Sequence, residues 1–88
     1  MSNVRETLAS RGACYGSFDE QARISQGFKQ VMLASPNWTA LPPQHRESLE
    51  LIAMKMSRIL NGDYNHFDSW HDIAGYAELV ADHLKSCD

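Results

Sequence analysis

The sequence has little cysteine, little excess charge and no long hydrophobic run. Its two cysteines, Cys14 and Cys87, have neither the spacing of metal ligands nor the number of a disulfide framework, so we expect reduced thiols in a cytoplasmic protein. The 8 Lys and Arg and 11 Asp and Glu include no dense basic stripe, which argues against binding to duplex nucleic acid. No run approaches the roughly 18 apolar residues of a membrane span, and no signal segment is present, so we expect no membrane partner.

Signals for β-structure are also missing. The sequence has no hairpin turn between alternating residues and no internal repeat, and its apolar residues recur at helical spacing. We therefore predict an all-α fold. A chain of 88 residues forms one small domain that buries a modest fraction of its surface, so we also expect a homo-oligomer.

The chain divides into an N-terminal arm, residues 1–16, and a helical domain, residues 17–88. The arm mixes small and polar residues with one short helical stretch, Val4 to Ala9. A capping box at Ser17, a pair of prolines before the second helix and Asn61-Gly62 after it mark the helix boundaries. The predicted helices run from Ser17 to Ala34, from Pro43 to Leu60 and from Asp68 to Leu84. We predict a three-helix bundle with a short N-terminal arm, completed by dimerisation.

The second and third predicted helices carry apolar residues on two opposite sides, counted at about 100° per residue. On the second helix one side comprises Leu49, Ile52, Ala53, Met56, Ile59 and Leu60, and the other comprises Glu47, Glu50, Leu51, Met54, Lys55 and Arg58. On the third helix the sides are Trp70, Ile73, Ala74, Ala77, Val80, Ala81 and Leu84, and Asp68, Asp72, Gly75, Tyr76, Leu79 and His83. A helix exposed on one side needs no second apolar set, so we expect dimerisation to cover these second sides.

The carboxylates on the less apolar sides of these two helices predict a magnesium site. Pairs of acids one turn apart on two facing helices bring several oxygens to one point, as a hard divalent cation requires. The candidate metal ligands are Glu47, Glu50, Asp68 and Asp72. Lys55 and Arg58 lie one or two turns further along, where they can hold the phosphates that the metal polarises. This constellation fits a nucleoside triphosphate pyrophosphohydrolase, with Glu47, Glu50 and Asp72 as catalytic residues.

A structural interpretation of the same residues stays open. Asp68 or Ser69 can cap the third helix, and Glu47 suits a helix N-terminus. Either glutamate of the second helix can also pair with Arg46 or Lys55 on a solvated face. The spacing of the residues does not choose between the two interpretations.

Two further features have alternative interpretations. Tyr15 and Tyr76 can stack on a base or pack in a small core. Gly12 and Gly16 flank Tyr15, but no phosphate-loop pattern surrounds them, which argues against a phosphate-binding loop there.

Several stretches resemble a family of small phage and prophage proteins classed as a domain of unknown function. They are Arg11 to Phe18, Ala22 to Gln26, Glu47 to Ile52 with Lys55, Arg58 to Asp63, and Asp68 to Tyr76. The resemblance extends from Arg11 to about His83. It implies a phage-encoded protein that acts in the cytoplasm of the host cell.

The second half is similar, more distantly, to the all-α MazG-like pyrophosphohydrolases. Their pattern is EExxE on one helix and ExxD on the next, and it binds magnesium and a nucleoside triphosphate. Here Glu47 and Glu50 match the last two acids of the first motif and Arg46 replaces the first acid. In the second motif Asp72 matches and Ser69 replaces the glutamate. The resemblance implies a nucleotide-binding protein whose hydrolytic activity depends on an incomplete acidic set.

A function of another class is also consistent with this sequence. A small acidic phage protein without enzymatic activity can bind a host protein and inhibit or redirect it, with its arm and exposed aromatics as the contact surface. The missing acids at Arg46 and Ser69 favour this alternative.

Overall fold

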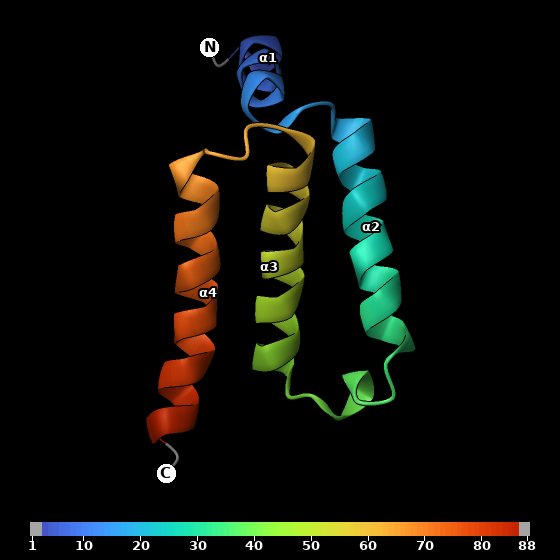
Figure 1. Cartoon of the computed structure of the whole chain (residues 1–88), viewed down its shortest axis with the longest axis vertical. Coiled ribbons are helices and arrows are strands. Elements are labelled where there is room, and N and C mark those ends of the chain that lie inside the picture. The colour runs from blue at the N-terminus through green and yellow to red at the C-terminus, as the bar shows by residue number, and fades with distance from the viewer. Residues whose placement is uncertain (1–2, 87–88) are drawn as a thin grey trace.

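The computed structural model describes residues 3–86, and their regular structure is entirely helical, with no strand among them (Figure 1). The elements are α1 (Val4–Tyr15), α2 (Phe18–Ala34), the 3₁₀ turn η1 (Trp38–Ala40), α3 (Pro43–Asn61) and α4 (Phe67–Ser86). The predicted all-α fold is confirmed. Cys87, one of the two predicted thiols, lies outside the described residues, whereas Cys14 is a free thiol.

The N-terminal arm contains a helix twice as long as predicted. Helix α1 continues past Ala9 to Tyr15, and the side chain of Asn3 caps it by accepting a hydrogen bond from the Glu6 amide at 3.2 Å. Residues 3–86 therefore contain four α-helices rather than three. The other predicted boundaries agree within a few residues. The Ser17 hydroxyl accepts from the Glu20 amide at 3.2 Å, as the capping box requires.

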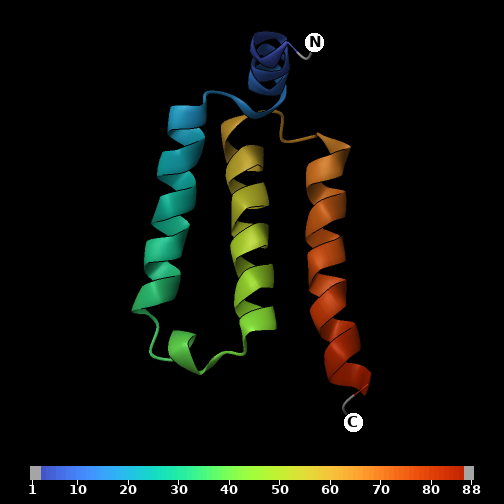
Figure 2. The same ribbon diagram turned by 180° about the vertical axis from the view of Figure 1, so that it is seen from behind.

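Helices α2, α3 and α4 form one open layer rather than a closed bundle. Views from the front and from behind place α3 in the middle, with α4 and α2 on opposite sides of it (Figures 1 and 2). Both views show α1 nearly end-on, so α1 stands across the end of the layer. The radius of gyration is 15.1 Å, whereas a compact chain of this length has about 12 Å. Among the described hydrophobic residues only Trp38 and Ala53 are buried.

Serine side chains are buried between the helices of the layer. Ser48 of α3 donates a hydrogen bond to the Tyr76 carbonyl of α4 at 3.2 Å, and Ser57 is fully buried and donates to the Met54 carbonyl at 2.6 Å. Ser25 of α2 and Ser69 of α4 are buried as well. Because serines occupy the contacts between the helices, most large hydrophobic side chains lie on the faces of the layer.

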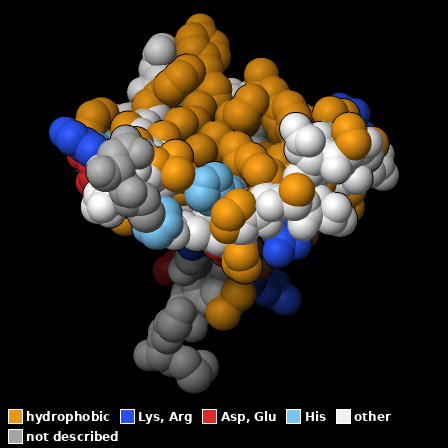
Figure 3. Space-filling view, turned by 90° about the horizontal axis from the view of Figure 1, so that it is seen from below, with side chains coloured by type: hydrophobic (Ala, Val, Ile, Leu, Met, Phe, Trp, Pro, Cys, Tyr) orange, Lys and Arg blue, Asp and Glu red, His pale blue; other side chains and the backbone are white. Residues whose placement is uncertain are grey.

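The contacts of α3 fix which residues lie on each face. Ser48 and Lys55 point toward α4, and Ala53 and Ser57 are buried in the layer, so the helical period places Leu49 on one face and Arg58 on the other. The first face, called the apolar face below, carries Ile24, Phe28, Val31, Leu49, Ile52, Met56, Trp70, Ala74 and Ala77. Figure 3, which looks along the helices, shows hydrophobic side chains spread over one side of the layer.

The opposite face is called the polar face below. By the same helical period it carries Lys29, Glu47, Glu50, Lys55, Arg58, Asp68 and Asp72. All six predicted site residues therefore lie on one face of the layer, and the apolar face carries none of them.

Candidate functional site

An ion pair joins α3, the middle helix, to α4 on the polar face. The Lys55 ammonium of α3 lies 2.8 Å from the Asp72 carboxylate of α4, and their side chains are 11% and 37% exposed. The hydrogen bond from Lys55 lowers the pKa of Asp72 against the effect of desolvation, and the positive charges of Lys55, His71 and Arg58 act in the same direction. In the single chain, Lys55 and Asp72 satisfy each other and join α3 to α4.

The two glutamates lie near the start of α3, away from this pair. Glu47 and Glu50 line one hollow of the surface together with Trp38 of η1 and Arg46. Glu50 also borders a smaller hollow beside Lys29 of α2. Neither glutamate forms an ion pair within residues 3–86, so the predicted pairing of either one with Arg46 or Lys55 is absent there.

Asp68 lies at the opposite end of the layer. Helix α4 begins at Phe67, so Asp68 and Ser69 lie in its first turn. The Asp68 carboxylate is 3.8 Å from the His66 imidazole and largely exposed. The Ser69 amide donates to the His66 carbonyl at 3.2 Å, and its side chain is buried in the layer.

The predicted metal ligands thus share a face without converging. Among residues 3–86 no three Asp, Glu, His or Cys side chains are grouped so that they can hold a metal ion. Mg²⁺ in nucleotide sites is commonly bound by one or two carboxylates together with substrate phosphates. Of the four predicted ligands, Glu47 and Glu50 fit that role, because they lie on consecutive turns and form no ion pair within residues 3–86, whereas Asp72 is bound to Lys55.

Arg58 differs from Lys55 in having no acidic partner at contact distance in the described chain. Its guanidinium carbon lies 4.4 Å from the centroid of the Tyr15 ring, an arrangement typical of a cation–π contact. Its Nε is buried and makes no hydrogen bond within residues 3–86. The Tyr15 ring also meets His66 edge-on, with centroids 5.5 Å apart. Of the two predicted phosphate-binding residues, Lys55 is therefore paired with an acid, whereas Arg58 has no acidic partner that would compete with a phosphate.

A crevice beside Arg58 was not predicted from the sequence. It has a volume of about 400 Å³ and lies between the end of α1, the start of α2 and the end of α3, with Arg11, Tyr15 and Phe18 in its walls. The stretch Arg11 to Phe18 stood out in the sequence, but it matches no known phosphate-binding pattern. Arg11 could not be connected with Arg58 before the position of α1 was known.

A comparison with models of protein families shows which family the chain belongs to. The model of the family described as domain of unknown function (DUF6378) matches residues 1–84. The chain belongs to this family. No curated protein and no solved structure matches it. The expected membership of a family of unknown function is confirmed, whereas phage origin and similarity to MazG stay predictions for this DUF6378 protein. Within residues 3–86, no helix is both long and apolar enough to cross a membrane.

Proposed function

We propose that this DUF6378 protein binds a nucleoside triphosphate on the polar face of its helical layer. The observation that carries the proposal is the placement of all six candidate residues on one face. On that face Arg58 lacks an acidic partner at contact distance, and Glu47 and Glu50 are free of ion pairs within residues 3–86. A face with an arginine free of ion pairs and a separate free acidic pair suits a phosphate chain with its magnesium ion.

The residues have distinct roles in this proposal. Arg58 binds phosphate oxygens, for which the planar guanidinium is well shaped. Asp72 positions Lys55, whose positive charge attracts the phosphate chain. Glu47 and Glu50 would hold Mg²⁺, which supplies polarisation of a phosphoryl oxygen when bound. The stronger form of the proposal, drawn from the resemblance to MazG, is hydrolysis to a monophosphate and pyrophosphate with Glu47, Glu50 and Asp72 as catalytic residues.

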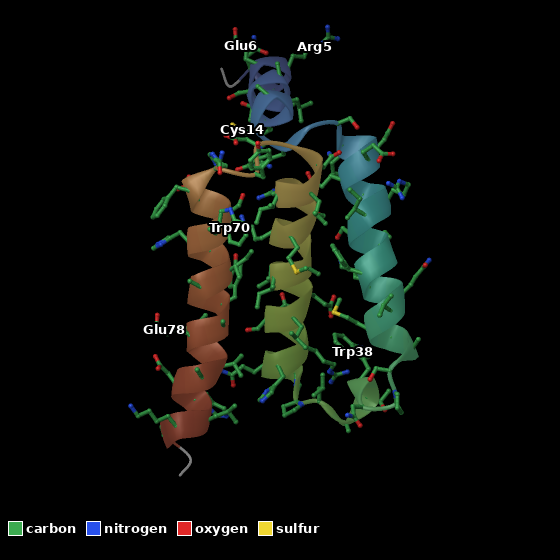
Figure 4. All side chains as sticks on the ribbon, viewed as in Figure 1. Arg5, Glu6, Cys14, Trp38, Trp70 and Glu78 are labelled. Atoms are coloured by element: carbon green, nitrogen blue, oxygen red, sulfur yellow. The ribbon has the colours of Figure 1, made fainter. Side chains whose placement is uncertain are left out.

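Calorimetry with each common nucleoside triphosphate, with and without magnesium, tests this function. We expect saturable binding that magnesium strengthens, and a parallel assay of pyrophosphate release tests the stronger form. Glu47→Gln combined with Glu50→Gln should remove the magnesium dependence. Glu78→Gln is the matched control, because Glu78 is exposed on the outer edge of α4, pointing away from α3 (Figure 4). The absence of both binding and pyrophosphate release with every triphosphate would refute the proposal.

We also propose that a second copy of the chain covers the apolar face, and not the opposite sides of α3 and α4 that the sequence led us to expect in the interface. The accessible surface of the single chain is 6490 Å², whereas a compact monomer of this size exposes roughly 5200 Å². The excess resembles the roughly 1000 Å² or more per subunit that obligate homodimers bury. A groove of about 400 Å³ between α2 and α3, lined only by apolar residues such as Phe28, Leu49 and Met56, lies on this face.

The oligomeric state separates this proposal from the non-enzymatic alternative. Light scattering at micromolar concentration should give a dimer. A stable monomer would instead favour a host protein as the partner of the apolar face, because a contiguous exposed patch of this kind marks an interaction surface.

A further inference from the structure

We propose that the crevice between α1, α2 and α3 binds a nucleotide, with its phosphates on Arg11 and Arg58 and its base against Phe18. The inference rests on the proposed nucleotide binding and assigns the phosphate contacts to a different pair of residues. Because Lys55 forms an ion pair with Asp72, we assign Arg11 rather than Lys55 as the second phosphate-binding cation.

The walls of the crevice are fixed in place by backbone contacts. The Asn61 side-chain amide donates hydrogen bonds of 2.8 Å to the carbonyls of both Tyr15 and Ser17, on either side of the turn between α1 and α2. The Asp63 amide donates to the Cys14 carbonyl at 2.7 Å. A Cβ on Gly62 would collide with the backbone of Cys14 and Tyr15, so glycine permits this close approach. The end of α1 is therefore held against the end of α3 in a preformed arrangement.

The electrostatics of the crevice favour an anion. Arg11 and Arg58 both line it, and none of its described lining residues is Asp or Glu. The buried Arg58 Nε has no hydrogen-bond partner in the described chain, which is an unfavourable state for a charged donor. Both guanidinium groups line the crevice, and two such groups suit the several oxygens of a phosphate chain.

The aromatic residues indicate that the anion also carries a ring. Phe18 lines the crevice and is 77% exposed, although it is a large apolar side chain. Bases stack on such rings, and the stacking tolerates any base. One face of the Tyr15 ring is already taken by Arg58, so Phe18 is the stacking residue. The volume of about 400 Å³ lies in the usual range of small-molecule sites.

Nitrogen-15 NMR of the full chain tests this site directly. ATP, AMP and inorganic phosphate are titrated separately without magnesium, and the signals followed are the Arg58 Nε–H and the amides of Arg11, Gly16 and Phe18. We expect saturable shifts of all four with ATP and AMP, and a weaker response of the arginine signals alone with inorganic phosphate.

Each contrary outcome is distinct. If ATP binds but shifts only the amides around Glu47 and Glu50, the crevice site is wrong and the proposed function stands. If inorganic phosphate shifts the crevice signals as strongly as ATP does, the anion site stands and nucleotide recognition is wrong. If no ligand shifts any signal, the crevice site is refuted, and calorimetry with magnesium and the other triphosphates decides the proposed function.

Matched variants separate the phosphate contact from the base contact. Arg11→Ala should weaken ATP binding about tenfold, the effect of losing one charge-assisted hydrogen bond. Arg5→Ala, on the same helix but outside the crevice, should leave it unchanged. Phe18→Leu should weaken the binding of ATP and not that of phosphate. Equal effects of Arg11→Ala and Arg5→Ala would overturn the assignment.

Discussion

The two faces of the helical layer differ in what already covers them. On the polar face Lys55 is paired with Asp72, and Arg58 lies over the Tyr15 ring of α1. On the apolar face large side chains such as Val31 and Met56 are exposed, and the apolar groove between α2 and α3 is open. Helix α1 therefore completes the polar face from within the chain, whereas the apolar face has no such cover. The difference indicates that ligand binding and self-association use opposite sides of the same three helices.

The largest effect is expected from a charge on the apolar face. Val31→Glu should convert the dimer to a monomer, because an unpaired charge buried in an interface costs about 3 kcal/mol or more. Leu33→Glu is the matched control: it lies on the same helix and is similarly exposed, at 65% against 73% for Val31, but it borders the Glu50 hollow on the other side. Analytical ultracentrifugation of both variants checks the result. If both variants dissociate the dimer, or if neither does, the assignment of the dimer interface to the apolar face alone is wrong.

A smaller effect is expected where α1 joins the polar face. Gly62→Ala should destabilise the protein by about 2 kcal/mol, because the new Cβ meets the backbone of Cys14 and Tyr15 and forces the end of α1 to move. It should also weaken nucleotide binding in the crevice. Gly75→Ala, with nothing near its Cβ, should instead stabilise α4 slightly. Thermal unfolding measures both changes. Equal melting temperatures for the two variants would contradict the fixed attachment of α1.

Because of the Lys55–Asp72 pair, the free energy of unfolding should decrease as the pH falls into the acidic range. The folded-state pKa of Asp72 is lowered from its ordinary value of 3.8. The stabilisation is therefore present in full above that value and is lost as the pH falls through the lower folded-state pKa. The difference in unfolding free energy between the wild type and Asp72→Asn should accordingly shrink below pH 3.8. The control is Asp82→Asn, an exposed carboxylate of α4. A difference between the wild type and Asp72→Asn that is independent of pH would exclude this pair as its source.

The smallest effect on the fold is expected from the acidic pair. Glu50→Gln should leave the melting temperature in metal-free buffer within about 2 °C of the wild type, because Glu50 has no ion pair in the described chain. It should remove most of the additional stabilisation given by magnesium with ATP. A lowered melting temperature without metal would instead assign Glu50 a structural role.

The helices of the layer could be predicted because their boundaries are local. Ser17 caps α2 through a residue three positions away, Pro43 suits the first turn of α3, and Gly62 follows its end. The length of α1 was underestimated because its sequence has no apolar period, and it is held by contacts of its last residues with Asn61 and Asp63. Such contacts join residues more than 40 positions apart, which no local pattern contains.

The positions of the three long helices and the two kinds of face on α3 and α4 follow from local sequence patterns alone. Helical periodicity fixes which residues share a side, and for this reason Glu47, Lys55 and Arg58 could be assigned to one face. That Lys55 meets Asp72, and that Arg11 and Arg58 line the same crevice, depends on the tertiary structure. Periodicity specifies the side of a helix but not its partner, and the partner depends on how the helices assemble into an open layer.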